Sequence, residues 1–276
     1  MPVFNKVAVV GTGLIGGSLA MALKRKKLAR RIVGVSRHEE TLRIAKKKSI
    51  IDSGSRDLNI VRDADLVILA TPVDTILKSG RAIRGLIKDS CIVTDVGSTK
   101  QKIVRSLARI FPRFVGSHPL AGSEKRGIIN ADPRIFKGSV CLLTPVAGTD
   151  RSALKKIQRL WESLGARVVF ISPERHDKAL AFVSHLPHIA AFSLINSVPA
   201  EDLKFASGGL RDTTRIAASD PGIWADIFLS NRSNIIKAIG VWQRNAGLLK
   251  SAIAHQDRRR IAGILNQAKS KRSKLS

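Results

Sequence analysis

The sequence contains no tyrosine, and its other aromatic residues are few, at 4% of 276 residues. Its only two cysteines, Cys91 and Cys141, lie in apolar runs, which excludes a disulfide framework and favours small buried side chains. No continuous apolar run approaches the roughly 18 residues that a membrane-spanning helix needs. The opening MPVFNKVAVV leads directly into an expected strand, so we expect no signal peptide and a cytoplasmic protein.

Acidic residues are also scarce, with 21 Asp and Glu against 48 Lys and Arg, for a formal net charge of +27. Such an excess first suggests nucleic acid as a partner. However, the basic residues are scattered, and no zinc-finger spacing or RNA-binding aromatic motif accompanies them. We therefore interpret the charge as a solvated surface that attracts small anionic substrates, and we expect no nucleic-acid partner.

Short runs rich in valine and isoleucine alternate with helical patterns over the first two-thirds of the chain. Most of these runs lack polar alternation, which is typical of strands buried on both faces of a parallel sheet. The alternation predicts an α/β fold with a Rossmann-type, doubly wound, largely parallel sheet. The runs are residues 6–10, 31–36, 65–72, 91–97, 113–117, 140–145 and 167–172.

The pattern changes after Ser172, because no convincing strand follows. Two long stretches, 176–198 and 223–254, are apolar at helical spacing, and Asp220 with Pro221 forms a helix start signal before the second. We predict a dinucleotide-binding domain over residues 1–172 and an all-helical domain over residues 173–276. Helices this apolar need more cover than a small domain provides, so we expect a homodimer formed through them.

A glycine-rich turn follows the first expected strand and precedes a helix, which is the arrangement that binds a dinucleotide. Its first glycine permits a tight turn, and its second lets the backbone approach a pyrophosphate at the helix N-terminus. A turn that binds nothing is the alternative interpretation. The expected cofactor-binding residues of this turn are Gly11, Thr12, Gly13, Leu14, Ile15 and Gly16.

Ser36 and Arg37 stand at the end of the second expected strand, where an NAD-binding domain usually carries a carboxylate for the adenosine ribose. A guanidinium suits a 2′-phosphate instead, because its planar fork matches phosphate oxygens. This pair therefore favours NADP, with NAD possible. Alternatively, Arg37 stacks on the adenine or faces solvent.

Polar residues also follow three further expected strands: Thr71 with Pro72, then Ser98, then His118. Ligands of open α/β sheets gather at the carboxyl ends of the strands, so these residues should converge near the nicotinamide. His118 lies in GSHPLAGSEKRG, residues 116–127, which we expect to be an irregular loop. A purely structural histidine is conceivable there, but the position after a strand favours a functional one.

The chain resembles the prephenate dehydrogenases of the TyrA family in several motifs that run in order from residue 6 to about residue 245. The resemblance implies a Rossmann domain joined to a helical dimerisation domain, a nicotinamide cofactor and a role in tyrosine biosynthesis. It implies oxidation and decarboxylation of prephenate to 4-hydroxyphenylpyruvate. The matching motifs are GTGLIGGSLA, DADLVILATPV, VTDVGSTK, GSHPLAGSEKRG, SHLPH and GGLRDTTRIAASDPGIWADIF.

The resemblance also implies roles for individual residues. His118 would accept the proton of the substrate alcohol, and Ser98 would act at the same hydroxyl. Arg215 would clamp a substrate carboxylate, and His188 would touch substrate or cofactor.

A second group is assigned more loosely. Ser123 and Glu124 would belong to the substrate site, where Glu124 tunes access or hydrogen bonding beside His118. Asp212 would orient an arginine. Gly208 and Trp224 match a segment that reaches the site from the partner subunit, although plain core packing is an alternative for Trp224.

Other functions remain open at this point. Arogenate, with an amino group where prephenate has a keto group, is the nearest rival substrate, and the sequence contains no residue that we can identify as distinguishing the two. Another Rossmann-plus-helical reductase would leave SHLPH and HPLAG unexplained, and a non-catalytic nucleotide sensor would not need His118 with Arg215. His185 and His188 could ligate a metal, but no third ligand accompanies them, so we expect no metal. His176 and His255 receive no role.

Overall fold

The computed structural model describes residues 3–122 and 125–275. Its first half is built on one eight-stranded sheet in the order β3-β2-β1-β4-β5-β6-β7-β8. This order, which reverses beside β1, is that of a doubly wound Rossmann-type sheet. The strands are β1 (Phe4–Val10), β2 (Ala29–Val35), β3 (Ser53–Ser55), β4 (Leu66–Leu69), β5 (Ile92–Asp95), β6 (Phe114–Pro119), β7 (Val140–Thr144) and β8 (Arg167–Phe170).

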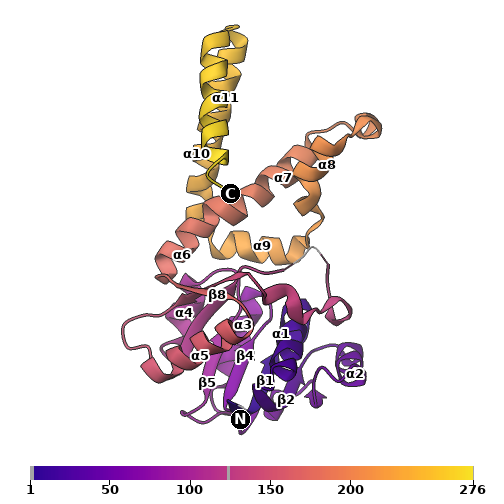
Figure 1. Ribbon diagram of the computed structural model, residues 1–276, viewed down its shortest axis with the longest axis vertical. Helices are drawn as coiled ribbons and strands as arrows, with labels where there is room; N and C mark the ends of the chain where they lie inside the picture. The colour runs from indigo at the N-terminus through magenta and orange to yellow at the C-terminus, as the bar shows by residue number, and fades with distance from the viewer. Residues whose placement is uncertain (1–2, 123–124, 276) are drawn as a thin grey trace.

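Helices cover this sheet, and further helices make up the second half (Figure 1). Those of the first half are α1 (Leu14–Arg25), α2 (Glu39–Lys47), α3 (Val73–Ile83), α4 (Gln101–Leu107) and α5 (Arg151–Ser163). Those of the second half are α6 (Pro173–Leu180), α7 (Leu186–Asn196), α8 (Gly208–Thr214), α9 (Pro221–Ser230), α10 (Arg232–Ala254) and α11 (Arg258–Arg272).

The predicted fold class is confirmed, because each apolar run identified in the sequence overlaps a strand. The central strands are buried on both faces, as in β4, where all four residues are buried. Two features were not predicted. The short edge strand β3 has the sequence SGS, which carries no apolar signal, and β7 pairs antiparallel with β6 while the strands before it pair in parallel.

His118 does not lie in an irregular loop as expected. It belongs to β6, where it pairs with Leu142 of β7. The antiparallel partner extends β6 beyond the residues that pair with β5, so Ser117, His118 and Pro119 are held in extended backbone. His118 is therefore fixed by a strand on one side rather than by loop geometry.

The second half has a small core of its own. Ala181, Ile235 and Ala238 are buried there, whereas most of the large core lies on the two faces of the sheet. Helices α10 and α11 extend away from the sheet as an antiparallel pair (Figure 1). Several apolar side chains on these helices are exposed, including Ile236 at 56% and Leu265 at 54%. The helical half thus presents apolar surface, as expected for a chain that associates through it.

The helix start at Asp220 is as predicted, since its carboxylate accepts a hydrogen bond from the Ile223 amide at 2.7 Å, with Pro221 in the first turn. The long stretch 223–254 is not one helix, however, because it breaks at Asn231 into α9 and α10. The stretch 176–198 is also interrupted, by a π-helical segment at Ala181–His185.

By length and composition alone, the segment Pro173–Asn196 could cross a membrane. It contains three buried polar residues, His176, Asp177 and His185, and each has a hydrogen-bond partner elsewhere in the protein. Polar groups inside a membrane are costly, and these belong to a protein interior. We therefore interpret the segment as part of the packed structure.

Candidate active site

The glycine-rich turn between β1 and α1 has the close contacts that its sequence requires. Gly11 adopts a positive φ of 99°, and a Cβ there would lie 2.5 Å from the Ala70 carbonyl oxygen. A Cβ on Gly16 would lie 1.9 Å from the Gly11 carbonyl oxygen. At Gly13, by contrast, nothing lies within 4 Å of such an atom. The first and third glycines are thus needed for folding, and the second leaves an open approach to the backbone.

Residues beside the glycine-rich turn also fit a bound dinucleotide. The N-terminus of α1 has no side-chain cap, so its amides can face an anion. Thr71 lines the same region, and its buried hydroxyl has no hydrogen-bond partner among the described residues. The side chain of Thr12 is 1% exposed and packs against Gly34, so our expectation of a cofactor contact there rests on the backbone of this residue.

Ser36 and Arg37 follow β2 directly, as expected. The Ser36 hydroxyl accepts a hydrogen bond from the His38 amide at 3.2 Å, which closes the turn into α2. Arg37 is exposed. Glu39 and Glu40 lie beyond this turn, in the first turn of α2, so no carboxylate occupies the strand end itself.

A cavity of about 770 Å³ lies between the carboxyl ends of β1, β4, β5 and β6 and the helical half. On the sheet side, its walls include Gly13, Leu14, Ile15, Thr71, Pro72, Ser98 and His118. On the helical side, they include Ser184, His188, Arg215, Ile216, Ile223 and Trp224. Half of the predicted cofactor residues therefore line one cavity with the predicted proton-transfer and carboxylate-binding residues, whereas Gly11, Thr12, Gly16, Ser36 and Arg37 do not line it.

His118 is the histidine on the sheet side of this cavity. Its Nδ1 lies 2.9 Å from Nε2 of His176, whose Nδ1 lies 2.8 Å from Oδ1 of Asp177. His176 and Asp177 are buried behind the cavity wall. Burial is the main cause that holds the pKa of His118 well below its usual range, and nearby His176 and Lys100 lower it further. His118 is consequently neutral at pH 7, as a proton acceptor must be.

The loop that carries Ser98 is fixed from below by a buried ion pair between Asp95 and Lys100, both 0% exposed. Asp95 also accepts hydrogen bonds from the amides of Gly97 at 2.8 Å and Ser117 at 3.3 Å. One carboxylate thus holds together the end of β5, the loop beyond it and the strand of His118. This arrangement places Ser98 and His118 in the same wall.

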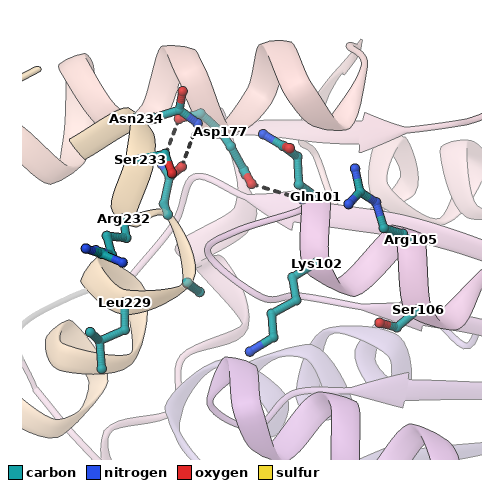
Figure 2. Close-up of a pocket in the computed structure, with 11 residues that line it drawn as sticks. Gln101, Lys102, Arg105, Ser106, Asp177, Leu229, Arg232, Ser233 and Asn234 are labelled. Carbon is teal, nitrogen blue, oxygen red and sulfur yellow. Dashed lines mark hydrogen bonds between the residues drawn. The ribbon is translucent and has the colours of Figure 1, made fainter. Parts of the chain in front are cut away.

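Asp177 has a second set of partners at the start of α4. Its two carboxylate oxygens accept hydrogen bonds from the amides of Lys100 at 2.7 Å and Gln101 at 3.0 Å. Figure 2 shows Asp177 beside Gln101, where a smaller pocket of about 320 Å³ separates α4 from the start of α10. Arg105 and Arg232 line that pocket. Asp177 therefore lines the smaller pocket, while its neighbour His176 contacts His118 of the larger cavity.

On the helical side, the ring of His188 stacks on Trp224 at 3.6 Å between centroids. His185 meets the same indole edge-on and is itself buried. The Asn231 amide donates to His185 Nδ1 at 3.2 Å. Pro187 lies in the first turn of α7, directly after the π-helical segment, so the residue that should kink a helix instead follows an existing irregularity.

Arg215 begins a short 3₁₀ segment after α8 and lines the cavity. Gly208, Arg211 and Asp212 lie on α8, and none of the three lines the cavity of its own chain. Our expectation for Gly208 concerns a neighbouring subunit, and our expectation that Asp212 orients an arginine stays a prediction. Ser123 and Glu124 fall outside the described residues.

At one edge of the cavity, Arg126 forms an ion pair with Asp220, the residue that caps α9. This contact joins the loop after β6 to the helical half. Among the described residues, no group of three or more His, Cys, Asp or Glu side chains is arranged to hold a metal ion.

No role was predicted for His176, Asp177, Lys100 or the carboxylate of Asp95. The partners of His176 and Asp177 lie far away in the chain, 58 residues from His176 to His118 and 77 from Asp177 to Lys100. One signal was available, because Asp95 ends a buried strand and Lys100 follows five residues later in DVGSTK.

Two family models match the chain: the prephenate dehydrogenase nucleotide-binding domain over residues 19–170 and the prephenate dehydrogenase dimerization domain over residues 172–267. Prephenate dehydrogenase of Bacillus subtilis is 36% identical, over 98% of this chain and 76% of its own length.

Two solved structures extend the likeness. The Aquifex aeolicus prephenate dehydrogenase, in complex with hydroxyphenyl propionate and NAD+, superimposes with a TM-score of 0.93 at 37% identity, covering 99% of this chain and 98% of that one. The Synechocystis arogenate dehydrogenase gives a TM-score of 0.84 at 30% identity, covering 98% and 100%. With both halves matched in order, the chain belongs to the prephenate dehydrogenase family.

Proposed function

We propose that this protein oxidises prephenate to 4-hydroxyphenylpyruvate and carbon dioxide. The observation that carries the proposal is a single cavity lined by a neutral His118, the guanidinium-bearing Arg215 and Gly13, whose backbone is open to a ligand. A bound nicotinamide cofactor supplies the hydride acceptor. The protein side chains then need to handle one alcohol proton and two carboxylates.

His118 takes the proton of the ring alcohol as the hydride leaves the same carbon, which yields a ring ketone. The bond to the ring carboxylate then breaks, carbon dioxide leaves, and its electron pair moves through the ring to the ketone oxygen. That oxygen takes the proton back from His118 and becomes the phenol. The proton balance closes within the site, so His118 returns unchanged and no proton is released.

The remaining cavity residues fit the other demands. Ser98 lies in the same wall as His118 and can hydrogen-bond the alcohol oxygen. Arg215 can hold a carboxylate through two parallel hydrogen bonds. His188, stacked on Trp224, presents a second polar edge to the substrate, while Ile216, Ile223 and Trp224 shield the ring from water.

The cofactor preference follows from Ser36 and Arg37. We expect NADP to be favoured over NAD, because a guanidinium rather than a carboxylate follows β2. The Aquifex relative is described with NAD+, so the preference is a property to be measured on this chain. Arg37→Ala should lose NADP selectivity, whereas the control Arg43→Ala, on the exposed face of α2, should keep it. That result would assign the cofactor preference to the Arg37 side chain.

Arogenate is the second candidate substrate, favoured by the likeness to the Synechocystis enzyme. The two substrates share the ring alcohol, the ring carboxylate and a second carboxylate, so His118 and Arg215 suit both.

One assay tests the function directly: turnover of prephenate and of arogenate, each with NAD and NADP. We expect the highest kcat/KM for prephenate with NADP. Turnover of arogenate alone would move the assignment to the second candidate, and absence of turnover with both substrates would overturn it.

We also propose a cytoplasmic homodimer, with the chain divided after residue 172 into a nucleotide-binding and a helical domain. The exposed apolar residues of α10 and α11 support association, and the family model of the second half is described as a dimerization domain. Light scattering should give twice the chain mass of 30.0 kDa. A monomer at micromolar concentration would contradict this.

A further inference from the structure

His176 is wholly buried between two functional groups. It is 0% exposed, and each ring nitrogen contacts a different side chain: Nε2 contacts His118, and Nδ1 contacts Asp177. A neutral imidazole has one donor nitrogen and one acceptor nitrogen, and in this histidine each faces a different functional side chain. His176 connects the active-site histidine to a buried carboxylate.

The hydrogen positions in the series His118–His176–Asp177 can be assigned by starting from Asp177. Both oxygens of Asp177 accept backbone amide hydrogens, from Lys100 and Gln101, which favours the ionised carboxylate. An ionised carboxylate can only accept, so His176 donates from Nδ1. Neutral His176 then has its lone pair on Nε2, and His118 must donate to it from Nδ1. The acceptor nitrogen of His118 is therefore Nε2.

When His118 accepts the substrate proton, its imidazole gains a positive charge that must be stabilised. Burial is the first cause that lowers the pKa of both His118 and His176, and Lys100 lowers both further. An isolated imidazolium at His118 is thus disfavoured. If His118 passes its Nδ1 proton to His176 as it gains one at Nε2, the positive charge comes to lie against Asp177, at 2.8 Å. The other titratable groups that face His118 and His176 are His185 and Asp95, which is paired with Lys100.

We propose that His176 and Asp177 hold His118 in the tautomer that accepts the substrate proton, and that they share this proton until it returns to the product. The inference rests on the proposed function, in which the proton leaves the alcohol and comes back to the phenol oxygen. No exit route to solvent is required, because the shared proton reverses its path. His176 and Asp177 touch neither substrate nor cofactor and act through His118, so they are positioning residues.

The tautomers can be measured without substrate. Two-bond ¹⁵N–¹H correlation spectra of histidine-labelled protein at pH 8 should show both His118 and His176 protonated at Nδ1. Spectra of His118→Asn and His176→Gln assign the two signals among the 6 histidines. A His118 protonated at Nε2 overturns the proposal, whatever the enzyme does with prephenate.

Kinetics of two variants test the consequence. In His176→Gln, the amide oxygen can still accept from His118 Nδ1, but the side chain cannot take a proton. In His176→Phe, both abilities are lost. We expect kcat to fall about tenfold in the glutamine variant and about 10²–10³-fold in the phenylalanine variant, within the range of proton-transfer catalysis. KM for the substrate and Kd for the cofactor should stay within twofold, since neither group touches His176.

His255→Gln is the matched control, because His255 is exposed at the end of α10 and hydrogen-bonds only the Ser251 carbonyl among the described contacts. It should behave as wild type. Wild-type kcat in either His176 variant overturns the proposal, and so does an equal loss in both. Should the phenylalanine variant fail to fold, the glutamine variant and the spectra decide.

These outcomes are separable from failure of the proposed function. If neither prephenate nor arogenate is turned over by wild type, the function fails while the Nδ1–H tautomers can still be observed. If wild type is active and the tautomers differ from those expected, the function stands and the proton-sharing arrangement fails.

Discussion

The imidazole of His188 lies against the indole of Trp224, with ring centroids 3.6 Å apart and 25° between the ring planes. His188 Nδ1 also donates to the Ser184 carbonyl at 3.0 Å, so the ring is fixed from its face and from one edge. Its remaining nitrogen, Nε2, is thereby held at one position on the cavity wall. Burial lowers the pKa of His188, which favours the neutral ring.

Trp224→Leu should release this ring. An aromatic pair contributes about 0.5–1.5 kcal/mol beyond its buried area, so we expect KM for the substrate to rise about 2–10-fold. Trp242→Leu is the control, because Trp242 lies on α10 and does not line the cavity. An equal rise in both variants would attribute the effect to general loosening of the helices.

His118→Asn should lower kcat by about 10²–10⁴-fold and leave cofactor affinity unchanged, because the variant lacks a titrating base but keeps the shape of the wall. In wild type, the lowered pKa of His118 should place the acid limb of kcat/KM below pH 6.5, since the base loses its activity only when protonated. Stopped-flow turnover measures kcat and its pH dependence, and fluorescence titration measures cofactor affinity. Near-normal kcat in this variant would remove His118 from the mechanism.

The glycine turn offers a matched pair of substitutions. Gly13→Ala adds a methyl group into open space, so melting temperature should hold while Kd for the dinucleotide rises at least tenfold. Gly16→Ala forces an atom to within 1.9 Å of the Gly11 carbonyl, so the protein itself should be destabilised. Thermal melts and cofactor titration separate the two effects. Unchanged cofactor affinity in Gly13→Ala would mean that the dinucleotide lies elsewhere.

Arg215→Lys should raise KM for the substrate about tenfold, because a lysine cannot form two parallel hydrogen bonds to one carboxylate. Arg211→Lys, on the neighbouring α8 and outside the cavity of its own chain, should have a smaller effect. Steady-state kinetics at saturating cofactor provide the comparison. A larger KM effect at Arg211 would exchange the two roles.

Buried histidines should make the protein acid-sensitive. Burial lowers the pKa of His185 to about 4, from 6.5 in the unfolded chain. Between these values the unfolded state binds the proton and the folded state does not, so stability is full above pH 6.5 and is lost as pH falls toward 4. The difference of about 2.5 units corresponds to roughly 3 kcal/mol at the acid end. Urea unfolding at pH 7 and pH 4 should show a smaller loss in His185→Gln than in wild type.

The sequence was sufficient to predict the fold and the cavity-lining residues that directly follow strands. Runs of valine and isoleucine located the buried strands, and the spacing of Gly11, Gly13 and Gly16 predicted a glycine turn with the close backbone contacts that the structure has. Polar residues after strands predicted that Ser98 and His118 lie close together, and both line the same cavity, because neighbouring strand ends meet at one edge of the sheet. These signals are local, so they can be read along a single stretch of chain.

What escaped prediction depends on distant contacts. Helix α4 has no side-chain cap of its own, and its first amides are satisfied by Asp177 from the other half of the chain. His176 has meaning only beside His118, which the antiparallel pairing with β7 keeps in a strand. No periodicity records such contacts, since they depend on how the two halves dock.

The anchoring of Asp177 has a mechanical consequence. Besides capping α4, this residue accepts a hydrogen bond from Asn231 at its backbone carbonyl, at 2.7 Å, so three segments meet at one buried point. The opposite edge of the cavity is joined by the partly exposed pair of Arg126 and Asp220. The two halves are therefore joined by a buried hinge contact at Asp177 on one side, the pivot, and by a solvent-accessible ion pair of Arg126 and Asp220 on the other, the latch. Any opening that admits cofactor and substrate by parting the latch would leave the pivot, and the histidines attached to it, in place.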